Sequence, residues 1–284
     1  MESIRQAVER AKAAHAENLS AQQAIDANQS REKTLAERGT AQPNFIKPQN
    51  FGDDIEEVNL KPAYLTSRRI IAHDNIDPRS RSFDILRTQV LRTMGLKAWQ
   101  VVGITSPTAG CGKTLTAVNL ALSIARLPEK SALLIDLDLR KPQVASSLGL
   151  SRELGIFDIL EHRVEISQAL VRTRIAQQEL LVLPAERSAL GTSELMASQA
   201  MTSLLQQIRK DYSSRTIIVD LPPMLAGDDV IGILPQLDCI LLVAAVGQTT
   251  IGQIEECSKH LQSVGVVRVV LNKSAEATNL EYYY

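Results

Sequence analysis

The hydrophobic pattern of the chain changes near residue 67. From there on, short runs that are apolar at nearly every position alternate with longer segments of helical character. These runs cover residues 101–104, 132–135, 180–183, 217–219, 240–243 and 266–271. Continuously apolar runs are typical of parallel strands that helices cover on both faces, and the intervening segments are long enough for crossover helices. The pattern predicts a doubly wound α/β domain with a mostly parallel sheet and helices on both faces.

Three of the intervening segments have a clear helical pattern. Residues 115–127 are apolar on nearly every side and stop at Pro128, which predicts a buried helix. Residues 193–212 predict one long amphipathic helix. Residues 253–264 predict another, with Gly265 as a suitable residue to end it.

Residues 1–66 differ from the rest of the chain. Residues 2–37 are rich in Ala, Gln, Glu and Arg and carry a thin apolar stripe, which indicates a weakly amphipathic helix. The pattern favours a solvated helix over a docking helix and leaves both open. Residues 40–54 contain two prolines and a glycine, as is typical of a linker. We therefore predict an N-terminal helical arm and linker, 1–66, and a domain, 67–284.

The composition narrows the class of protein. Of the 284 residues, 44% are hydrophobic, which is enough for a core. Lys and Arg number 31 against 32 Asp and Glu, so a chain that binds nucleic acid over its whole surface is disfavoured. The three cysteines, at 111, 239 and 257, have no metal-binding spacing and favour a reducing compartment. The chain lacks a long apolar run and a signal-peptide pattern, so we expect a cytoplasmic protein that meets a membrane only through a partner.

The segment TSPTAGCGKT, residues 105–114, follows the apolar run 101–104 and precedes a predicted helix. Pro107 stands where the strict phosphate-loop pattern has its first glycine. Two glycines still let successive N–H groups point inward at phosphate oxygens, and the helix that follows adds its N-terminal dipole. Nucleotide binding is therefore favoured over an ordinary strand–helix turn. The expected nucleotide-binding residues are Ala109, Gly110, Cys111, Gly112, Lys113, Thr114 and Leu115.

Individual residues of this loop have separate expected roles. Lys113 can reach the β- and γ-phosphates, and the Thr114 hydroxyl can join the coordination shell of Mg²⁺. For Cys111 the simpler interpretation is a tolerated small residue, and a redox-sensitive brake on nucleotide binding is the alternative.

Three aspartates follow two of the predicted strands. Asp136 and Asp138 come after the run 133–135, and Asp220 comes after 217–219. Ligands of open α/β sheets bind outside the carboxyl ends of the strands, where the glycine loop also lies. A single aspartate at such a position is usually a helix N-cap, but three beside a phosphate loop favour magnesium binding and proton transfer.

These segments carry a resemblance to a known family. TSPTAGCGKT, LLIDLDLRKP and IIVDLPP resemble the Walker A, Walker A′ and Walker B motifs of bacterial tyrosine kinases, which are P-loop proteins of the deviant Walker type that act in capsule and exopolysaccharide synthesis. The segment 68–92 resembles the stretch before the Walker A loop in tyrosine autokinases associated with exosortase and polysaccharide gene clusters. The related ParA and MinD type of ATPase carries a signature lysine five residues before the loop lysine, where this chain has Thr108.

The resemblance implies roles for the site residues, with ATP and Mg²⁺ as cofactors. Lys113 would bind phosphates and take part in catalysis, and Thr114, Asp138 and Asp220 would hold Mg²⁺. Asp136 would deprotonate the tyrosine hydroxyl, and Asp138 would support metal or water. Asn272 and Lys273 match a position near the adenine base, although a polar strand end is an equally open interpretation. Asp228 is a weaker candidate.

The family's interface helix carries the pattern E-x-x-R-x-x-R, which this chain matches in part. Asp84 replaces the glutamate, and Arg87 matches the first arginine. Val90 stands at the position of the second arginine, and Arg92 is a nearby substitute. The resemblance therefore implies a homo-oligomer with Asp84 and Arg87 at its interface, and leaves the part played by this helix in ring assembly open.

The sequence ends in Tyr282, Tyr283 and Tyr284, within a segment that has no core pattern. The resemblance implies that they are phosphoacceptors, whereas a tail that merely packs is the alternative. The predicted function is an ATP-dependent protein-tyrosine autokinase that regulates exopolysaccharide or capsule synthesis or export. Its expected partner is a membrane polysaccharide co-polymerase or chain-length determinant, which would hold it at the inner membrane. The alternatives are an ATP switch without kinase activity and a binding module that has lost nucleotide affinity.

Overall fold

The computed structural model describes residues 55–151, 153–264 and 267–274. The predicted arm and linker up to residue 54, Gly265 and the three terminal tyrosines lie outside the described residues.

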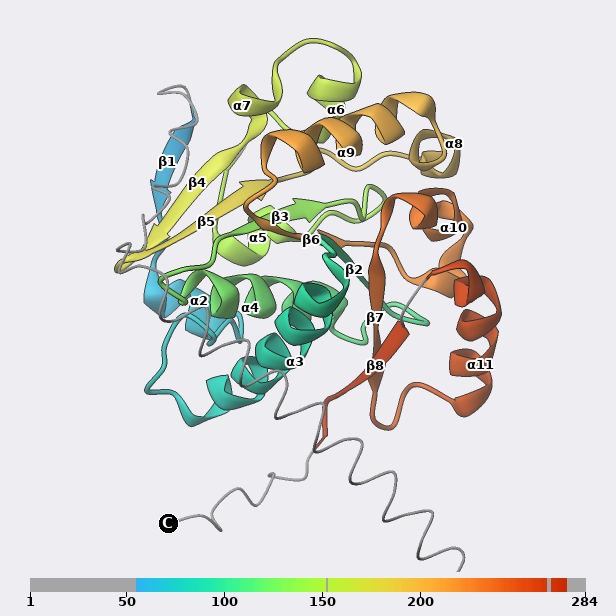
Figure 1. The fold of residues 1–284 in the computed structure, drawn as a ribbon, viewed down its shortest axis with the longest axis horizontal. Coiled ribbons are helices and arrows are strands. Elements are labelled where there is room, and N and C mark those ends of the chain that lie inside the picture. Colours follow the sequence, from blue (N-terminus) through green and yellow to red (C-terminus); the bar gives the residue numbers. More distant parts are fainter. Residues whose placement is uncertain (1–54, 152, 265–266, 275–284) are drawn as a thin grey trace, which may run out of the picture. The chain divides into compact units, whose positions relative to one another are not determined.

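The described residues form an eight-stranded sheet in the order β1-β4-β5-β3-β6-β2-β7-β8 (Figure 1). Every neighbouring pair is parallel except β4 and β5, which are antiparallel. The strands are β1 (Glu56–Asn59), β2 (Val101–Thr105), β3 (Ala132–Asp136), β4 (Val171–Ile175), β5 (Gln178–Leu183), β6 (Thr216–Asp220), β7 (Cys239–Ala245) and β8 (Val267–Asn272). The predicted α/β fold with a mostly parallel sheet is confirmed.

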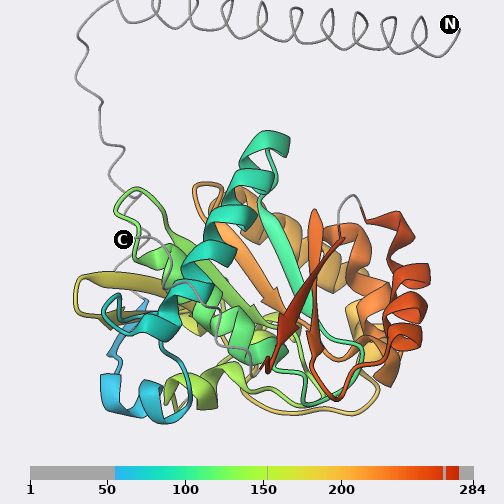
Figure 2. The ribbon, with the colours of Figure 1, turned by 90° about the horizontal axis from the view of Figure 1, so that it is seen from below.

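Helices cover both faces of this sheet (Figures 1 and 2). One face packs against α2 (Pro62–Ser67), α3 (Arg81–Lys97), α4 (Lys113–Ala125) and α5 (Val144–Leu148). The other packs against α6 (Ile156–Leu160), α7 (Ile166–Ala169), α8 (Thr192–Met196), α9 (Gln199–Asp211), α10 (Asp229–Ile233) and α11 (Ile251–His260). Short 3-10 turns lie at Pro78–Ser80, Met224–Ala226, Leu234–Gln236 and Leu261–Ser263.

The continuous apolar runs reflect this two-sided cover. In β3, Leu133 and Ile135 join the core under α9, whereas Leu134 joins the core under α4. Because successive side chains of a strand point to opposite faces, a strand buried on both faces needs apolar residues at every position. Helix α4 lies in the middle of one core, and its buried residues agree with the predicted buried helix.

Two strands have no continuous apolar run, and the sequence patterns did not predict them. The edge strand β1 is the segment EEVN, which is mostly exposed. In β4 the residues alternate between buried and half-buried, which suits an antiparallel strand near the edge. β1 pairs with β4, and α2 begins at Pro62, so residues 56–66 belong to the folded domain and not to the predicted arm and linker.

The predicted single helix over 193–212 is wrong, because the structure divides it into α8 and α9. Ser198 separates them: its side chain accepts a hydrogen bond from the Met201 N–H and so starts α9 as an N-cap. The last predicted helix is present as α11, which begins at Ile251 and continues into the turn Leu261–Ser263. Within the described parts of the chain, none of the helices combines the length and the apolar character needed to cross a bilayer.

Candidate nucleotide and phosphoryl-transfer site

The loop between β2 and α4 has the backbone conformation expected of a phosphate loop. Gly110 and Gly112 have φ angles of 82° and 96°, in the left-handed region that favours glycine. Gly112 is the residue that precedes α4, so the free N–H groups at the start of this buried helix face the loop. A Cβ on Gly112 would also collide with the Asn272 side-chain amide. Conformation and crowding therefore both require glycine at position 112.

The ends of β7 and β8 hold this loop in place. The Asn272 side-chain amide donates a hydrogen bond of 2.9 Å to the Cys111 carbonyl oxygen. The Gln248 amide donates one of 2.7 Å to the Ala109 carbonyl, and the Lys273 ammonium donates one of 3.1 Å to Gln248 Oε1. Asn272 thus lies at the loop, and its predicted place beside an adenine base stays a prediction. Sequence reasoning missed Gln248, since a lone polar residue after a strand carries no distinctive signal.

Four of the predicted site residues meet at the start of α4. The Lys113 Nζ lies 2.8 Å from Asp138 Oδ2 and 3.4 Å from both carboxylate oxygens of Asp220. The Thr114 hydroxyl donates a hydrogen bond of 2.6 Å to Asp220 Oδ2. All four side chains are buried. The parallel strands β3 and β6 bring these carboxylates together because both strands end at the edge that carries the loop.

Asp136 lies opposite Asp220 in the register of β3 and β6. Its Oδ2 accepts hydrogen bonds of 3.0 Å and 2.9 Å from the N–H groups of Gln143 and Val144, and its Oδ1 accepts one of 3.2 Å from the Asp138 N–H. Asp136 therefore also shapes the turn that leads into α5, in addition to its predicted role as a base.

Burial and mutual repulsion change the protonation of these groups. Burial raises the pKa of Asp136 to about 8, and the nearby charge of Asp220 adds to the increase. Burial raises the pKa of Asp220 to about 6, although the attraction of Lys113 opposes it. Burial alone would lower the pKa of Lys113. The negative charges of Asp220 and Asp138 have the larger combined effect, so the pKa of Lys113 is raised. The site therefore holds more carboxylate charge than one ammonium group neutralises.

The chemistry of these donors fits a magnesium nucleotide. Carboxylate and hydroxyl oxygens are hard ligands of the kind that Mg²⁺ prefers, and Asp138, Asp220 and Thr114 provide them beside the glycine loop. Across the described residues, no group of three or more His, Cys, Asp or Glu side chains forms a complete metal cage. Proteins usually bind Mg²⁺ through one or two carboxylates together with phosphates and water, so this arrangement suits Mg²⁺ bound with a nucleotide.

Cys111 is buried inside the loop. Its Sγ lies 3.6 Å from the Thr108 hydroxyl oxygen and 3.5 Å from that of Thr249. Burial would raise the pKa of the Cys111 thiol, but hydrogen bonds with Thr249 and Thr108 outweigh it, so the pKa is lowered. This packing agrees with a small residue that the loop tolerates, and the redox brake stays a hypothesis.

Three other predicted residues lie away from this group. Asp228 is exposed at the start of α10, where a hydrogen bond with Ser193 lowers its pKa. Asp84 and Arg87 lie on α3, where Asp84 Oδ1 is 3.0 Å from a guanidinium nitrogen of Arg87. Asp84 also contacts Arg126 of α4 at 3.1 Å. Their predicted role at an oligomer interface stays a prediction.

Arg140 connects the turn after β3 to two other loops. Its guanidinium lies 2.6 Å from Asp229 Oδ2 and donates hydrogen bonds to Thr192, to Ser193 and to the Ala226 carbonyl. These contacts fix the turn that carries Asp138 against the segments that follow β5 and β6. The segment LLIDLDLRKP contains this arginine, but the sequence alone gave it no role.

Comparison with known proteins agrees with this geometry. A family model described as an AAA domain matches residues 99–265. The tyrosine-protein kinase CpsD of Streptococcus pneumoniae is 32% identical over 178 residues, which cover 61% of this chain and 76% of CpsD. The chain belongs to the bacterial tyrosine kinase family. The predicted Walker A, Walker A′ and Walker B segments, at 105–114, 133–142 and 217–223, all lie within the residues that the family model matches.

Solved bacterial tyrosine kinase domains share this fold. The kinase domain of the Escherichia coli tyrosine kinase ETK matches with a TM-score of 0.63 and 26% identity, over 76% of this chain and 84% of that domain. The VpsO kinase domain matches with a TM-score of 0.61 and 29% identity, over 71% of this chain and 100% of that domain. EpsB of Ralstonia solanacearum is 31% identical over 78% of this chain, which spans 28% of EpsB. The chain therefore corresponds to one part of EpsB.

Proposed function

We propose that the chain is an ATP-dependent protein-tyrosine autokinase that phosphorylates its own C-terminal tyrosines, Tyr282, Tyr283 and Tyr284. The observation that carries the proposal is the meeting of Lys113 with Asp138 and Asp220 beside the glycine loop. Phosphoryl transfer depends chiefly on positioning and on neutralisation of phosphate charge, and these groups are suited to both tasks.

Each group has a defined part in the proposed reaction. The backbone N–H groups around Gly110 and Gly112 bind phosphate oxygens, and Lys113 turns its ammonium from the carboxylates toward the β- and γ-phosphates. Thr114, Asp138 and Asp220 would hold Mg²⁺, which when bound supplies further neutralisation of the phosphate charge. Asp136 in its ionised form accepts the proton of the attacking tyrosine hydroxyl, and burial, which raises its pKa to about 8, makes that carboxylate a stronger base than an ordinary one.

The cellular setting rests on the motif resemblance. We propose that the kinase regulates exopolysaccharide or capsule synthesis or export and assembles as a homo-oligomer. Its partner would be a membrane polysaccharide co-polymerase or chain-length determinant, which places the chain on the cytoplasmic side of the inner membrane. The near balance of acidic and basic residues supports a protein partner over nucleic acid.

The kinase activity is tested on the purified full chain with ATP and Mg²⁺. Phosphotyrosine is detected by antibody and located by mass spectrometry. We expect modification of the terminal tyrosines, no signal in Lys113→Ala or in the triple Tyr282–284→Phe variant, and a normal signal in Lys130→Ala. Lys130 is an exposed lysine before β3, at the opposite edge of the sheet. ATP-dependent assembly without phosphotyrosine would contradict the proposal and indicate an ATP switch.

A further inference from the structure

The two edge strands of the sheet differ in how they are protected. β1 and β8 lie at opposite ends of the sheet (Figure 1). β1 carries two exposed glutamates, Glu56 and Glu57, and Glu57 pairs with Arg174 of the neighbouring strand at 2.9 Å. Charged side chains on an edge strand discourage pairing with another molecule. β8 instead carries two apolar residues, Val269 and Leu271, which are 51% and 63% exposed, so it lacks this protection at both positions.

The backbone of β8 is also open for pairing. In the described part of the chain, β8 has a strand neighbour only on the side of β7. The Val246 N–H, just after β7, donates a hydrogen bond of 2.9 Å to the Asn272 carbonyl oxygen, so the backbone groups of Asn272 face β7. Because these groups alternate in direction along a strand, those of Val269 and Leu271 face the open edge. Each of the two residues offers one N–H and one C=O there.

The side chains of the same two residues share one face of the sheet. Val270 packs against the core under α3 and α4. Because successive side chains of a strand point to opposite faces, Val269 and Leu271 lie on the face of α11. They stand opposite Leu242 and Ala244 of β7 in the register. An added strand would therefore meet apolar side chains and backbone groups at the same two residues.

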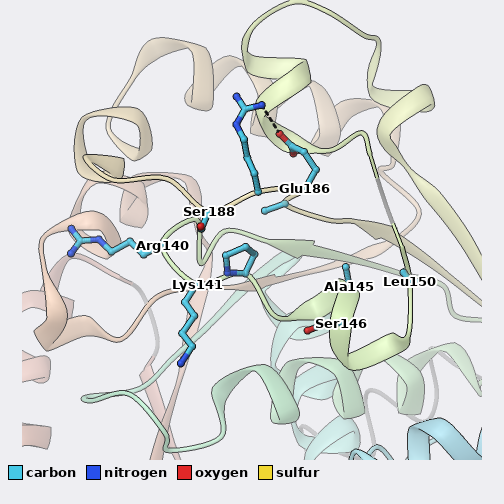
Figure 3. Close-up of a pocket in the computed structure, with 10 residues that line it drawn as sticks. Arg140, Lys141, Ala145, Ser146, Leu150, Glu186 and Ser188 are labelled. Atoms are coloured by element: carbon cyan, nitrogen blue, oxygen red, sulfur yellow. Dashed lines mark ion pairs between the residues drawn. The ribbon is translucent and has the colours of Figure 1, made fainter.

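The other face of β8 is incompletely filled. A cavity of about 120 Å³ lies between β8 and α3, and its lining is mainly apolar, with Leu86, Val90 and Val270 among the residues. The cavity beside the turn after β3, by contrast, is lined by charged groups such as Arg140 and Glu186 (Figure 3). An apolar hollow beside an open edge strand suits a neighbouring strand that brings further apolar side chains.

We propose that β8 pairs with β8 of a second copy of the chain, antiparallel and about a two-fold axis at Val270. In this register Val269 lies opposite the partner's Leu271, and Leu271 lies opposite the partner's Val269. Both residues point their backbone groups at the open edge, so each pair exchanges two hydrogen bonds. The side chains of the two pairs meet on the face of α11 and form one apolar contact. The partner's Val270 faces Val270 beside the cavity.

The charges of the strand are compatible with this register. Arg268, the charged residue within β8, lies opposite the partner's Asn272. The two copies of Arg268 are about 14 Å apart, so salt largely screens their repulsion. Lys273 follows the strand, but its ammonium donates a hydrogen bond of 3.1 Å to Gln248, which follows β7.

Symmetry favours this pairing over pairing between the two different edges. A strand that pairs with its own copy about a two-fold axis uses the same surface twice, so the assembly closes at two copies. Pairing of β8 with β1 of the next copy would leave a free edge at each end and would add further copies. The surface is also separate from Asp84 and Arg87, whose side chains contact α4 within one copy.

The contact is measured on the full chain without ATP, so the result does not depend on the proposed kinase function. Sedimentation velocity between about 1 and 200 μM should show a monomer–dimer equilibrium, since a contact of this size is expected to be weak. Val269→Lys and Leu271→Lys should each weaken dimerisation at least about tenfold, because the dimer loses each apolar contact twice. The matched control Leu190→Lys, at a residue that is 99% exposed, should dimerise as the parent does.

Two cysteine variants test the register. At the two-fold axis the Cα atoms of Val270 and the partner's Val270 would be about 4.5 Å apart, within the range of a disulfide. Val270→Cys should therefore give a cross-linked dimer on oxidation with copper phenanthroline. Arg268→Cys should not, because its two copies are about 14 Å apart. The three native cysteines are buried, so they add little background.

The inference is overturned if the full chain stays monomeric over the whole concentration range, or if Val269→Lys and Leu271→Lys dimerise as Leu190→Lys does. Cross-linking of Arg268→Cys without cross-linking of Val270→Cys would contradict the register. Species that grow beyond the dimer and are lost in Val269→Lys would indicate pairing with β1 and contradict the two-fold arrangement. Phosphotyrosine formation is recorded in parallel, and a dimer that forms no phosphotyrosine would contradict the kinase proposal alone.

Discussion

Two clusters of charged side chains, both built on α4, differ in how their charges balance. In the nucleotide site, three carboxylates gather around the Lys113 ammonium group: Asp136, Asp138 and Asp220. Between α3 and α4, a single carboxylate, Asp84, lies between the guanidinium groups of Arg87 and Arg126. The first cluster has an excess of negative charge, and the second has none.

The difference separates a site that can take up a cation from a contact that joins two helices. Asp84 Oδ1 pairs with Arg87 and also accepts a hydrogen bond of 2.6 Å from the Ser123 hydroxyl. Asp84 Oδ2 pairs with Arg126. The site carboxylates are more deeply buried, and burial raises the pKa of both Asp136 and Asp220. Holding excess carboxylate charge away from water is costly, so a cation that neutralises it binds favourably.

We expect the two clusters to differ most in how far a substitution lowers the rate of phosphotyrosine formation. Asp138→Asn keeps the shape of the side chain but removes a charge that faces Lys113 and, by our proposal, Mg²⁺. We expect the rate of phosphotyrosine formation to fall at least about 100-fold. Asp84→Asn, the matched change in the other cluster, should reduce the rate by less than about threefold. Similar losses in both variants would show that the two clusters do not differ in function.

The excess charge should also appear in the pH dependence of stability. Burial raises the pKa of Asp136 to about 8 in the folded protein, well above the ordinary value of an aspartate, so the folded state holds this proton more tightly than the unfolded chain does. The free energy of unfolding should therefore fall as the pH rises from about 4 to 8. Asp136→Asn should reduce this fall by several kcal/mol, since each pKa unit corresponds to about 1.4 kcal/mol. Urea titrations without nucleotide at several pH values measure it, and an unchanged slope in the variant would contradict the pKa shift.

The cluster around Asp84 should matter for folding instead. Asp84→Ala leaves Arg87 and Arg126 facing each other in a half-buried position, with no carboxylate between them. We expect the free energy of unfolding to fall by about 2 kcal/mol. Glu256→Ala removes an exposed carboxylate that pairs with Lys259 and should cause no measurable loss. Equal urea midpoints for Asp84→Ala and the parent would show that this cluster does not stabilise the α3–α4 contact.

The sequence predicted the centre of the molecule better than its edges. Strands β3 and β6 are buried on both faces, and that burial requires the continuous apolar runs from which they were predicted. Strand β1 has a single apolar residue, so local pattern carries no signal for it. The break between α8 and α9 depends on one N-cap serine, Ser198, within an otherwise continuous amphipathic pattern.

The same reasoning explains which parts of the site were predictable. Lys113, Asp138 and Asp220 follow strands, and parallel strands bring such residues to one edge of a sheet. Gln248 and Arg140 act through tertiary contacts with the Ala109 carbonyl and with Asp229. Nothing in their local sequence specifies those partners, so only the folded structure assigns them a part.

By our proposal, the glycine loop and the aspartates of β3 and β6 form one magnesium–nucleotide site. Titration calorimetry of the full chain with ATP, in excess Mg²⁺ and again in EDTA, tests it most directly. We expect Mg²⁺ to tighten ATP binding by at least about tenfold. Equal affinity in the two buffers, or no ATP binding in either, would contradict it.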